Sequence, residues 1–387
     1  MRGISLYVHL PFCAARCPYC DFATAPASSA LRARYLGALA TEIAREGAAL
    51  GRPRLRTIFV GGGTPSLLDP PEVARLDAAL RAGFAHRPRP REVTVEANPA
   101  TLDRARLEAW RELGVTRLSL GAQSLSARGL RALGRTHQPE DVPAAVEAAR
   151  SLGLRVAIDL IFGWPGQSVG EWREDLDTAV ALGPDHLSCY PLELELEPEA
   201  SIANWPGAGW KGLERWRRTA AACQPDDRGL AVLYAVAQRY LARAGYRHYE
   251  ISNWAREGSI CLHNSTYWRN GPWLGVGAGA HSHLGGVRSC RPVSLARYIG
   301  DIERDAPRIV DQGADETVDA AILALRLDTG IDLARFALRR GADARERVAR
   351  ALGATGVVGL VRWSGDRVTL TPRGRILASE VFVQLIP

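Results

Sequence analysis

The chain has 387 residues, 47% of them hydrophobic, enough for the core of one large domain and a smaller second one, which excludes a disordered chain. Seven cysteines, three of them within eight residues, argue against a secreted disulfide framework and favour metal ligands in a reducing compartment. The net charge of +7 suits an anionic partner, yet the arginines alternate with acids along helical stretches, so we interpret most of them as solvated helix faces.

Strand-like and helix-like segments alternate through the first half of the chain, as repeated βα units do. Six strands are predicted, at Gly3 to His9, Thr57 to Val60, Glu92 to Ala97, Thr116 to Leu120, Arg155 to Leu160 and His186 to Tyr190. Helices are predicted between them, at Ser29 to Leu50, Pro71 to Ala82, Asp103 to Leu113, Pro139 to Leu152 and Val169 to Leu182. This order predicts a parallel sheet that is either doubly wound or closed into a full or partial barrel, and the pattern alone favours neither.

The second half of the chain is less regular. The segment Asn204 to Trp216 is rich in Gly and Trp, so we predict an irregular excursion there, followed by a helix from Asp227 to Ala244. The segment Tyr246 to Leu284 is unusually aromatic and contains several histidines. After about Val293 helical patterns precede a hairpin that turns at Ser364 to Asp366, and a final helix follows.

Helices followed by a hairpin predict a small winged-helix-like domain at the C-terminus. This shape often binds DNA, but it also serves as a lid or a packing module, and we expect no nucleic-acid partner. The four helical patterns before the hairpin are Leu295 to Arg304, Glu316 to Leu327, Leu333 to Leu338 and Ala344 to Ala351. The predicted division of the chain is therefore 1–200, 201–292 and 293–387.

The stretch "LPFCAARCPYCDF" contains Cys13, Cys17 and Cys20. Three thiolates suit zinc or an iron–sulfur cluster, because soft ligands select those metals. A zinc site would need a fourth ligand, for which His9 or Asp21 could serve, but the other four cysteines form no CxxC pair. Three protein ligands on a four-iron cluster would leave one iron open to a substrate or cosubstrate.

A glycine run follows the second predicted strand in "FVGGGTPSLL". Without Cβ atoms the backbone can approach a small ligand closely, although a glycine run is equally typical of a tight turn. Three later strands end in or are closely followed by a polar residue: Glu96, Gln123 and Asp159. Because the carboxyl ends of parallel strands converge on one site, these three side chains can lie around one cavity.

The cysteine motif followed by "GGGTP" resembles the radical S-adenosylmethionine superfamily. Further motifs resemble its oxygen-independent coproporphyrinogen oxidase branch, HemN and its relatives, over most of the chain: "YVHLPFC", "VEANP", "SLGAQS", "GRTH" and "DLIFGWPGQ". The resemblance implies an α/β fold, a partial (β/α)6-type barrel with the smaller winged-helix-like domain behind it. It also implies that the three cysteines bind a [4Fe–4S] cluster. The S-adenosylmethionine site would be lined by Tyr7, Tyr19, Gly62, Gly63, Thr64, Glu96, Gln123, Arg135 and Asp159.

Two departures separate this chain from the oxidases. The oxidases resemble CxxxCxxCxC and have an N-terminal extension, whereas this chain has Phe22 at the last cysteine position and starts just before its first strand. Together with "HNSTYW" from His263 to Trp268, these features are similar to HemW-type haem chaperones, whose marker is HNxxYW. The resemblance implies haem binding and delivery to haem proteins such as respiratory enzymes. Oxidative decarboxylation of coproporphyrinogen III is the alternative, and whether the chain is an enzyme stays open.

The aromatic, histidine-bearing segment suits haem, an apolar disc with anionic edges and an iron that accepts imidazole. His263 is the candidate axial ligand, with His281 as the second choice, and aromatic walls would come from Tyr267, Trp268 and Trp273. The alternative for His263 is a hydrogen-bonded core residue, which is the commoner role of a lone histidine among apolar neighbours.

Location and partners follow from the remaining patterns. No apolar stretch of signal-peptide length precedes the first cysteine, and no segment reaches the roughly 20 apolar residues that cross a bilayer. We therefore expect a cytoplasmic protein. Its expected partners are haem and recipient haem proteins, including ones at the membrane surface.

Overall fold

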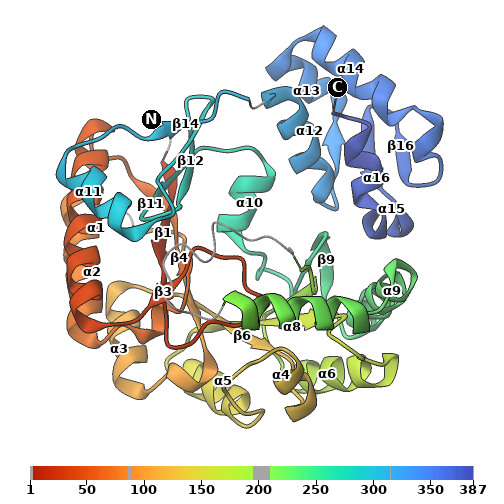
Figure 1. The fold of residues 1–387 in the computed structure, drawn as a ribbon. Helices are drawn as coiled ribbons and strands as arrows, with labels where there is room; N and C mark the ends of the chain where they lie inside the picture. Colours follow the sequence, from red (N-terminus) through yellow and green to blue (C-terminus); the bar gives the residue numbers. More distant parts are fainter. Residues whose placement is uncertain (1–2, 86–88, 195–209, 314, 387) are drawn as a thin grey trace.

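The computed structural model describes residues 3–85, 89–194, 210–313 and 315–386 (Figure 1). All six predicted strands are present and pair in parallel in chain order. They are β1 (Ile4–Leu10), β4 (Leu55–Gly62), β5 (Glu92–Ala97), β6 (Arg117–Gln123), β7 (Arg155–Phe162) and β8 (His186–Pro191). The five predicted crossover helices are also present, as α1 (Ser29–Ala49), α2 (Pro70–Gly83), α3 (Arg104–Leu113), α5 (Asp141–Ser151) and α6 (Val169–Ala181).

The strand order distinguishes a doubly wound sheet from a barrel. A doubly wound sheet reverses its order at a switch point, whereas here each strand pairs with the next without reversal. Right-handed crossovers in one direction place every helix on the same face of the sheet, which then curls with its helices outside. Figure 1 shows α1, α2, α3, α5 and α6 along the outside of the curved sheet. The α/β partial barrel is confirmed.

Local signals explain why these helices start where they do. Asp69 and Ser168 each cap a helix and form a capping box with the glutamate three residues later, Glu72 or Glu171. The inward faces of the helices then bury their apolar side chains against the sheet. Trp172, for example, is fully buried, and its indole N–H donates to the carbonyl of Leu233, so its polar atom is satisfied.

The segment Tyr246 to Leu284 extends the sheet at both edges. β11 (Trp273–Val276) pairs in parallel with β1 on the side away from β4, and β12 (His281–Leu284), β13 (Val287–Cys290) and β14 (Ile309–Val310) continue that edge. At the other edge, β10 (Asn253–Ala255) and β9 (Arg247–Glu250) follow β8 in antiparallel order. Between these two groups lies α10 (Leu262–Trp268).

The prediction of an irregular excursion is wrong from Trp210 onward. Helix α8 (Trp210–Cys223) begins there, and a second helix, α9 (Asp227–Arg243), follows as predicted. Residues 204–209 of the excursion lie outside the described residues. Gly and Trp are poor evidence against a helix here, because tertiary packing overrides their weak intrinsic preferences.

The C-terminal region has a core of its own. It contains α12 (Glu316–Arg326), α13 (Leu333–Arg340), α14 (Ala342–Leu352), α15 (Pro372–Ile376) and α16 (Ala378–Val383) around a small sheet. That sheet includes the predicted hairpin, β16 (Val361–Ser364) and β17 (Arg367–Leu370), with β15 (Ile331–Asp332) beside it. The preceding helix, α11 (Leu295–Glu303), instead joins the core of the barrel next to α1. The exact division into three parts stays a prediction.

No helix in the described part of the chain has the length and apolar character needed to cross a membrane.

Candidate metal and cofactor site

The three cysteines lie on a loop that follows β1 at its carboxyl end. The loop is closed at its base, where β2 (Phe12–Cys13) pairs with β3 (Ala25–Pro26). All seven cysteines of the chain are free thiols. Burial raises the pKa of Cys13 to about 11 and that of Cys20 to about 12. These thiols therefore hold their protons at neutral pH unless a cation replaces them.

The glycine run braces this cysteine loop. The Gly63 N–H donates to the Leu10 carbonyl at 2.8 Å, and the Thr64 N–H donates to the Phe12 carbonyl at 2.7 Å. The Thr64 hydroxyl also donates to the Cys13 sulfur at 3.5 Å. A Cβ on Gly63 would lie 2.7 Å from the Phe12 oxygen, so only glycine allows the two loops to pack this closely.

His9 and Tyr7, at the end of β1, form a fixed buried pair beside the glycine run. His9 Nε2 donates to the Ala23 carbonyl at 2.8 Å, which leaves Nδ1 to accept from the Tyr7 hydroxyl at 2.9 Å. Burial lowers the pKa of His9 to about 4, so its ring is neutral. A Cβ on Gly62 would lie 2.5 Å from this ring, and Gly62 has a φ of 116°, which favours glycine.

The predicted carboxylates converge at the carboxyl ends of the strands. Glu96 accepts from the Gly62 N–H at 2.9 Å, and burial, assisted by the charge of Asp159, raises its pKa to about 7. Asp159 accepts from the Ser119 hydroxyl at 3.0 Å, and burial raises its pKa also. Gln123 lies beyond them at a bulge in β6, with a φ of 67°.

Arg135 links the cysteine loop to β6. One terminal nitrogen donates to the Cys17 sulfur at 3.3 Å, and the other donates to the Gly121 carbonyl at 2.8 Å. Its Nε is buried with no partner among the described residues. Tyr19 lies against a small apolar cluster that includes Leu133 and Trp164. The structure therefore brings together the predicted cysteines, glycines, strand-end carboxylates, Arg135 and Tyr19.

His263 lies at the other end of the barrel. Its side chain is fully buried, and both ring nitrogens are occupied: Nδ1 bonds the Thr57 hydroxyl at 2.9 Å and Nε2 bonds the Tyr267 hydroxyl at 2.7 Å. Thr57 is near the amino end of β4, five residues before Gly62, or roughly 16 Å along the strand. The structure does not bring His263 to the cysteine loop.

His281 lies near an edge of the sheet. It begins β12, its side chain is exposed, and it stands opposite Cys290 of β13. Burial of part of the ring, with the nearby charge of Arg308, lowers its pKa. The two predicted haem ligands are therefore in different surroundings. His263 is buried near the amino end of the barrel, and His281 is exposed near an edge of the sheet.

The sequence analysis missed Arg217, a residue of α8 that contacts the cysteine loop. Its guanidinium donates to the carbonyls of Pro18 and Cys20 and pairs with Asp21 at 2.6 Å. In the sequence it is one of several arginines in "ERWRR", and no local pattern distinguishes it from its neighbours.

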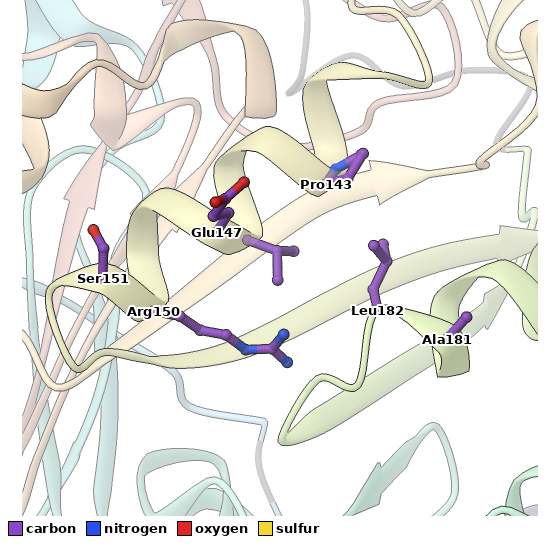
Figure 2. A pocket seen from close by; sticks show the side chains of 7 residues that line it. Pro143, Glu147, Arg150, Ser151, Ala181 and Leu182 are labelled. Carbon is purple, nitrogen blue, oxygen red and sulfur yellow. The ribbon is translucent and has the colours of Figure 1, made fainter.

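A surface depression of about 520 Å³ lies elsewhere, between α5 and the end of α6 (Figure 2). It is lined by side chains such as Glu147, Arg150 and Leu182, on the outer, helical layer of the barrel. It contains none of the predicted site residues, so we place the candidate site at the strand ends instead.

Comparison with known proteins shows the family to which the chain belongs. A family model of the radical SAM superfamily matches residues 7–179, and one of the HemN C-terminal domain matches residues 313–377. The curated protein "Heme chaperone HemW" of Mycobacterium tuberculosis is 37% identical, covering 100% of this chain and 95% of that one. The protein of the same name from Bacillus subtilis is 33% identical over 98% of both chains. The chain belongs to the HemW family.

The structural comparison supports the fold of this family. The solved structure of coproporphyrinogen III oxidase (HemN) from Escherichia coli, a radical SAM enzyme, is 22% identical to this chain. The match covers 99% of this chain and 90% of that one with a TM-score of 0.83, which shows a shared fold.

Membership of the radical SAM superfamily implies a [4Fe–4S] cluster and S-adenosylmethionine. The described residues contain no group of three or more His, Cys, Asp or Glu side chains arranged around a single metal ion. The fit of the cysteine loop to a cluster therefore rests on its donors: three free thiols, with Arg135 and Thr64 already directed at two of the sulfurs. The unpartnered Nε of Arg135 leaves a donor for a further ligand.

Proposed function

We propose that this protein is a haem chaperone, which binds haem and delivers it to haem proteins, including respiratory enzymes at the membrane. The observation that carries the proposal is the identity of 33–37% with proteins named heme chaperone HemW over nearly the whole of both chains. Phe22 adds support, since its exposed side chain stands where the oxidase pattern has a further cysteine. We place the protein in the cytoplasm.

The second part of the proposal concerns the cluster site. Cys13, Cys17 and Cys20 would hold a [4Fe–4S] cluster, which when bound would supply electrons for chemistry on S-adenosylmethionine. Cluster binding would displace the thiol protons, because the thiolate is the form that ligates iron; burial raises the pKa of Cys13 and Cys20, so these two thiols are protonated before binding. Arg135 and Thr64 would donate hydrogen bonds to two of the thiolates, which stabilises their negative charge.

The remaining predicted residues would bind S-adenosylmethionine. Glu96 and Asp159 can accept hydrogen bonds from its amino group or ribose hydroxyls, and the free Nε of Arg135 can donate to its carboxylate. Backbone groups of Gly62, Gly63 and Thr64 and the side chains of Tyr7, Tyr19 and Gln123 would complete the wall of the site. The support is that these side chains lie around the same strand ends as the cysteine loop.

His263 is the proposed haem ligand, with His281 as the second candidate. Support for His263 comes from the hexapeptide "HNSTYW", and support for His281 comes from its exposed ring. Ligation by His263 would have to replace one of its two hydrogen bonds, with Thr57 or Tyr267. Haem at His263 would have to reach a fully buried ring in α10, whereas the His281 side chain is exposed.

A haem titration tests the chaperone proposal. The full chain with its cluster reconstituted anaerobically should give a Soret band that saturates with added haem, and one of His263→Ala and His281→Ala should shift or weaken it. Haem-loaded protein mixed with the apo form of a respiratory haem enzyme should restore haem to that enzyme. If no Soret change occurs, or coproporphyrinogen III is converted to protoporphyrinogen IX with reductant and S-adenosylmethionine, the proposal is wrong.

Iron and sulfide analysis tests the cluster separately. We expect about four irons and four sulfides per chain after reconstitution, with all three Cys→Ala variants losing them. Tightly bound zinc in place of the cluster would contradict the assignment.

A further inference from the structure

Helix α8 connects to the cysteine loop through one buried guanidinium. In Figure 1 α8, in green, crosses the front of the view next to α9. Arg217 is 1% exposed, although it belongs to a helix that is otherwise largely polar on its outer side. A guanidinium is costly to bury, so it persists only where several acceptors surround it.

Among the described residues, three acceptors of Arg217 belong to the loop around Cys20. Nε donates to the Pro18 carbonyl at 2.8 Å, and Nη2 donates to the Cys20 carbonyl at 3.3 Å and to the Asp21 carboxylate at 2.6 Å. These atoms come from both sides of the third cysteine. The planar, multidentate guanidinium thus determines the backbone path between Cys17 and Asp21, which a single ammonium group could not do.

A second guanidinium reaches the same carbonyl from inside the loop. Arg16 donates to the Cys20 carbonyl at 3.3 Å, so two positive charges lie beside this cysteine. With Arg135 at the Cys17 sulfur, three guanidiniums contact the cysteine loop. The acids near it include Asp21, which pairs with Arg217, and Glu96, whose charge acts on Cys13. Positive charge held close to thiolate ligands favours the more negative, reduced state of an iron–sulfur cluster.

From these contacts we propose that Arg217 is a positioning residue of the cluster. It holds the Cys20 segment in the conformation that ligates iron and stabilises the reduced cluster by its buried charge. The inference rests on the cluster part of the proposed function and is independent of haem. No local sequence pattern marks Arg217, since its role depends on α8 folding back over a loop some 200 residues earlier.

The test compares Arg217→Gln with Arg218→Gln in the full chain. Arg218 is adjacent on α8, but its side chain is 72% exposed and, among the described residues, pairs with Glu214 one turn earlier, so it is a matched control. Cluster loss on exposure to an iron chelator should be at least tenfold faster in Arg217→Gln and unchanged in Arg218→Gln. At a fixed solution potential the ratio of reduced to oxidised cluster should fall about tenfold, which is about 59 mV for a one-electron couple.

Two further variants keep the test interpretable if Arg217→Gln folds poorly. Arg217→Lys keeps the charge, so the ratio of reduced to oxidised cluster should stay within about threefold of the wild-type ratio. It should still lose the cluster faster than the wild type, because lysine cannot bond several carbonyls at once. Asp21→Asn removes the anion and should shift the potential in the opposite direction to Arg217→Gln.

The outcomes separate this inference from the proposed function. If wild-type protein holds no cluster, the cluster assignment fails before Arg217 is tested. If wild-type protein holds one, and Arg217→Gln matches Arg218→Gln in both chelator sensitivity and potential, the positioning role is wrong and the cluster assignment stands. If Arg217→Gln loses the cluster faster but its reduction potential is unchanged, Arg217 positions the loop without stabilising the reduced cluster. The electrostatic part of the inference is then wrong.

Discussion

Glu96 is half-buried at the strand ends, where it accepts a hydrogen bond from the Gly62 N–H. Burial raises its pKa from 4.5 to about 7, so the folded protein favours the protonated form. Its contribution to stability is therefore fully present below about pH 4.5 and is lost as the pH rises through about 7. Below about pH 7 the protonated Glu96 carries no charge, so it attracts a cationic ligand less strongly than the ionised form does.

Binding of S-adenosylmethionine to the cluster-loaded protein should strengthen by up to about tenfold between pH 6 and pH 8, because Glu96 becomes ionised over that range. Calorimetric titration at several pH values measures this. Glu96→Gln cannot ionise, so its affinity should vary less over the same range. An unchanged slope in Glu96→Gln would show that another group controls binding.

The glycine run gives a steric prediction. Gly63→Ala would place a Cβ 2.7 Å from the Phe12 carbonyl oxygen and push the glycine and cysteine loops apart. We expect a loss of about 1–3 kcal/mol in the free energy of unfolding and fewer irons retained per chain. Urea denaturation and iron analysis measure these two effects.

Gly37→Ala is the control for this substitution. Gly37 lies in α1 with no atom within 4 Å of the added Cβ, so alanine there should stabilise the protein by about 0.5–1 kcal/mol. Equal effects at the two glycines would contradict the packing argument for Gly63.

At the scale of elements, α10 closes the amino end of the barrel. Its first N–H groups, from Leu262 and His263, donate to the buried Glu92 carboxylate at 3.1 and 2.9 Å, as expected for an anion at a helix N-terminus. Arg117, also buried, lies 3.6 Å from the same carboxylate. Helix α10 and the hexapeptide "HNSTYW" are thus anchored to the first residue of β5.

Glu92→Gln should therefore destabilise the protein by about 3 kcal/mol, because it leaves the buried Arg117 without its anion. Glu108→Gln provides the control, since Glu108 forms an exposed pair with Arg104 within α3 and should change stability by less than about 1 kcal/mol. Urea denaturation compares the two. Matching midpoints would mean that α10 does not depend on Glu92.

At the scale of the whole molecule, the C-terminal region joins the barrel through α10 and β9. Arg326, at the end of α12, stacks over the Trp268 ring at 4.4 Å and lies 3.7 Å from the buried Glu250 carboxylate. Arg375 of α15 donates to the His248 carbonyl of β9 at 3.1 Å. These contacts connect two separate apolar cores.

Arg326→Gln should weaken this connection, since it removes a cation–π contact and leaves Glu250 short of a positive partner. The expected loss is about 2–3 kcal/mol, with the unfolding transition broadening or splitting in calorimetry as the two cores separate. Arg350→Gln, on an exposed pair with Glu346, should melt like the wild type. A single unshifted transition in Arg326→Gln would show that other contacts join the cores.

The sequence by itself determined the parts of this protein that depend on neighbouring residues. Local residue spacing predicts the alternation of strands and helices, the cysteine and glycine loops and the C-terminal hairpin. Each of these features is present in the fold. Convergence of Glu96 and Asp159 also followed, because parallel strands bring their carboxyl ends to one edge.

The tertiary structure alone decided how distant segments meet. Side-chain periodicity reports which face of an element is buried and not which element covers it, so the sequence could not show β11 beside β1 or Arg217 on the cysteine loop. For the same reason the pattern around His263 suggested a ligand, whereas the fold places this histidine in a hydrogen-bonded network at the far end of the barrel. Non-local pairing depends on the whole chain, and no short stretch of it contains that information.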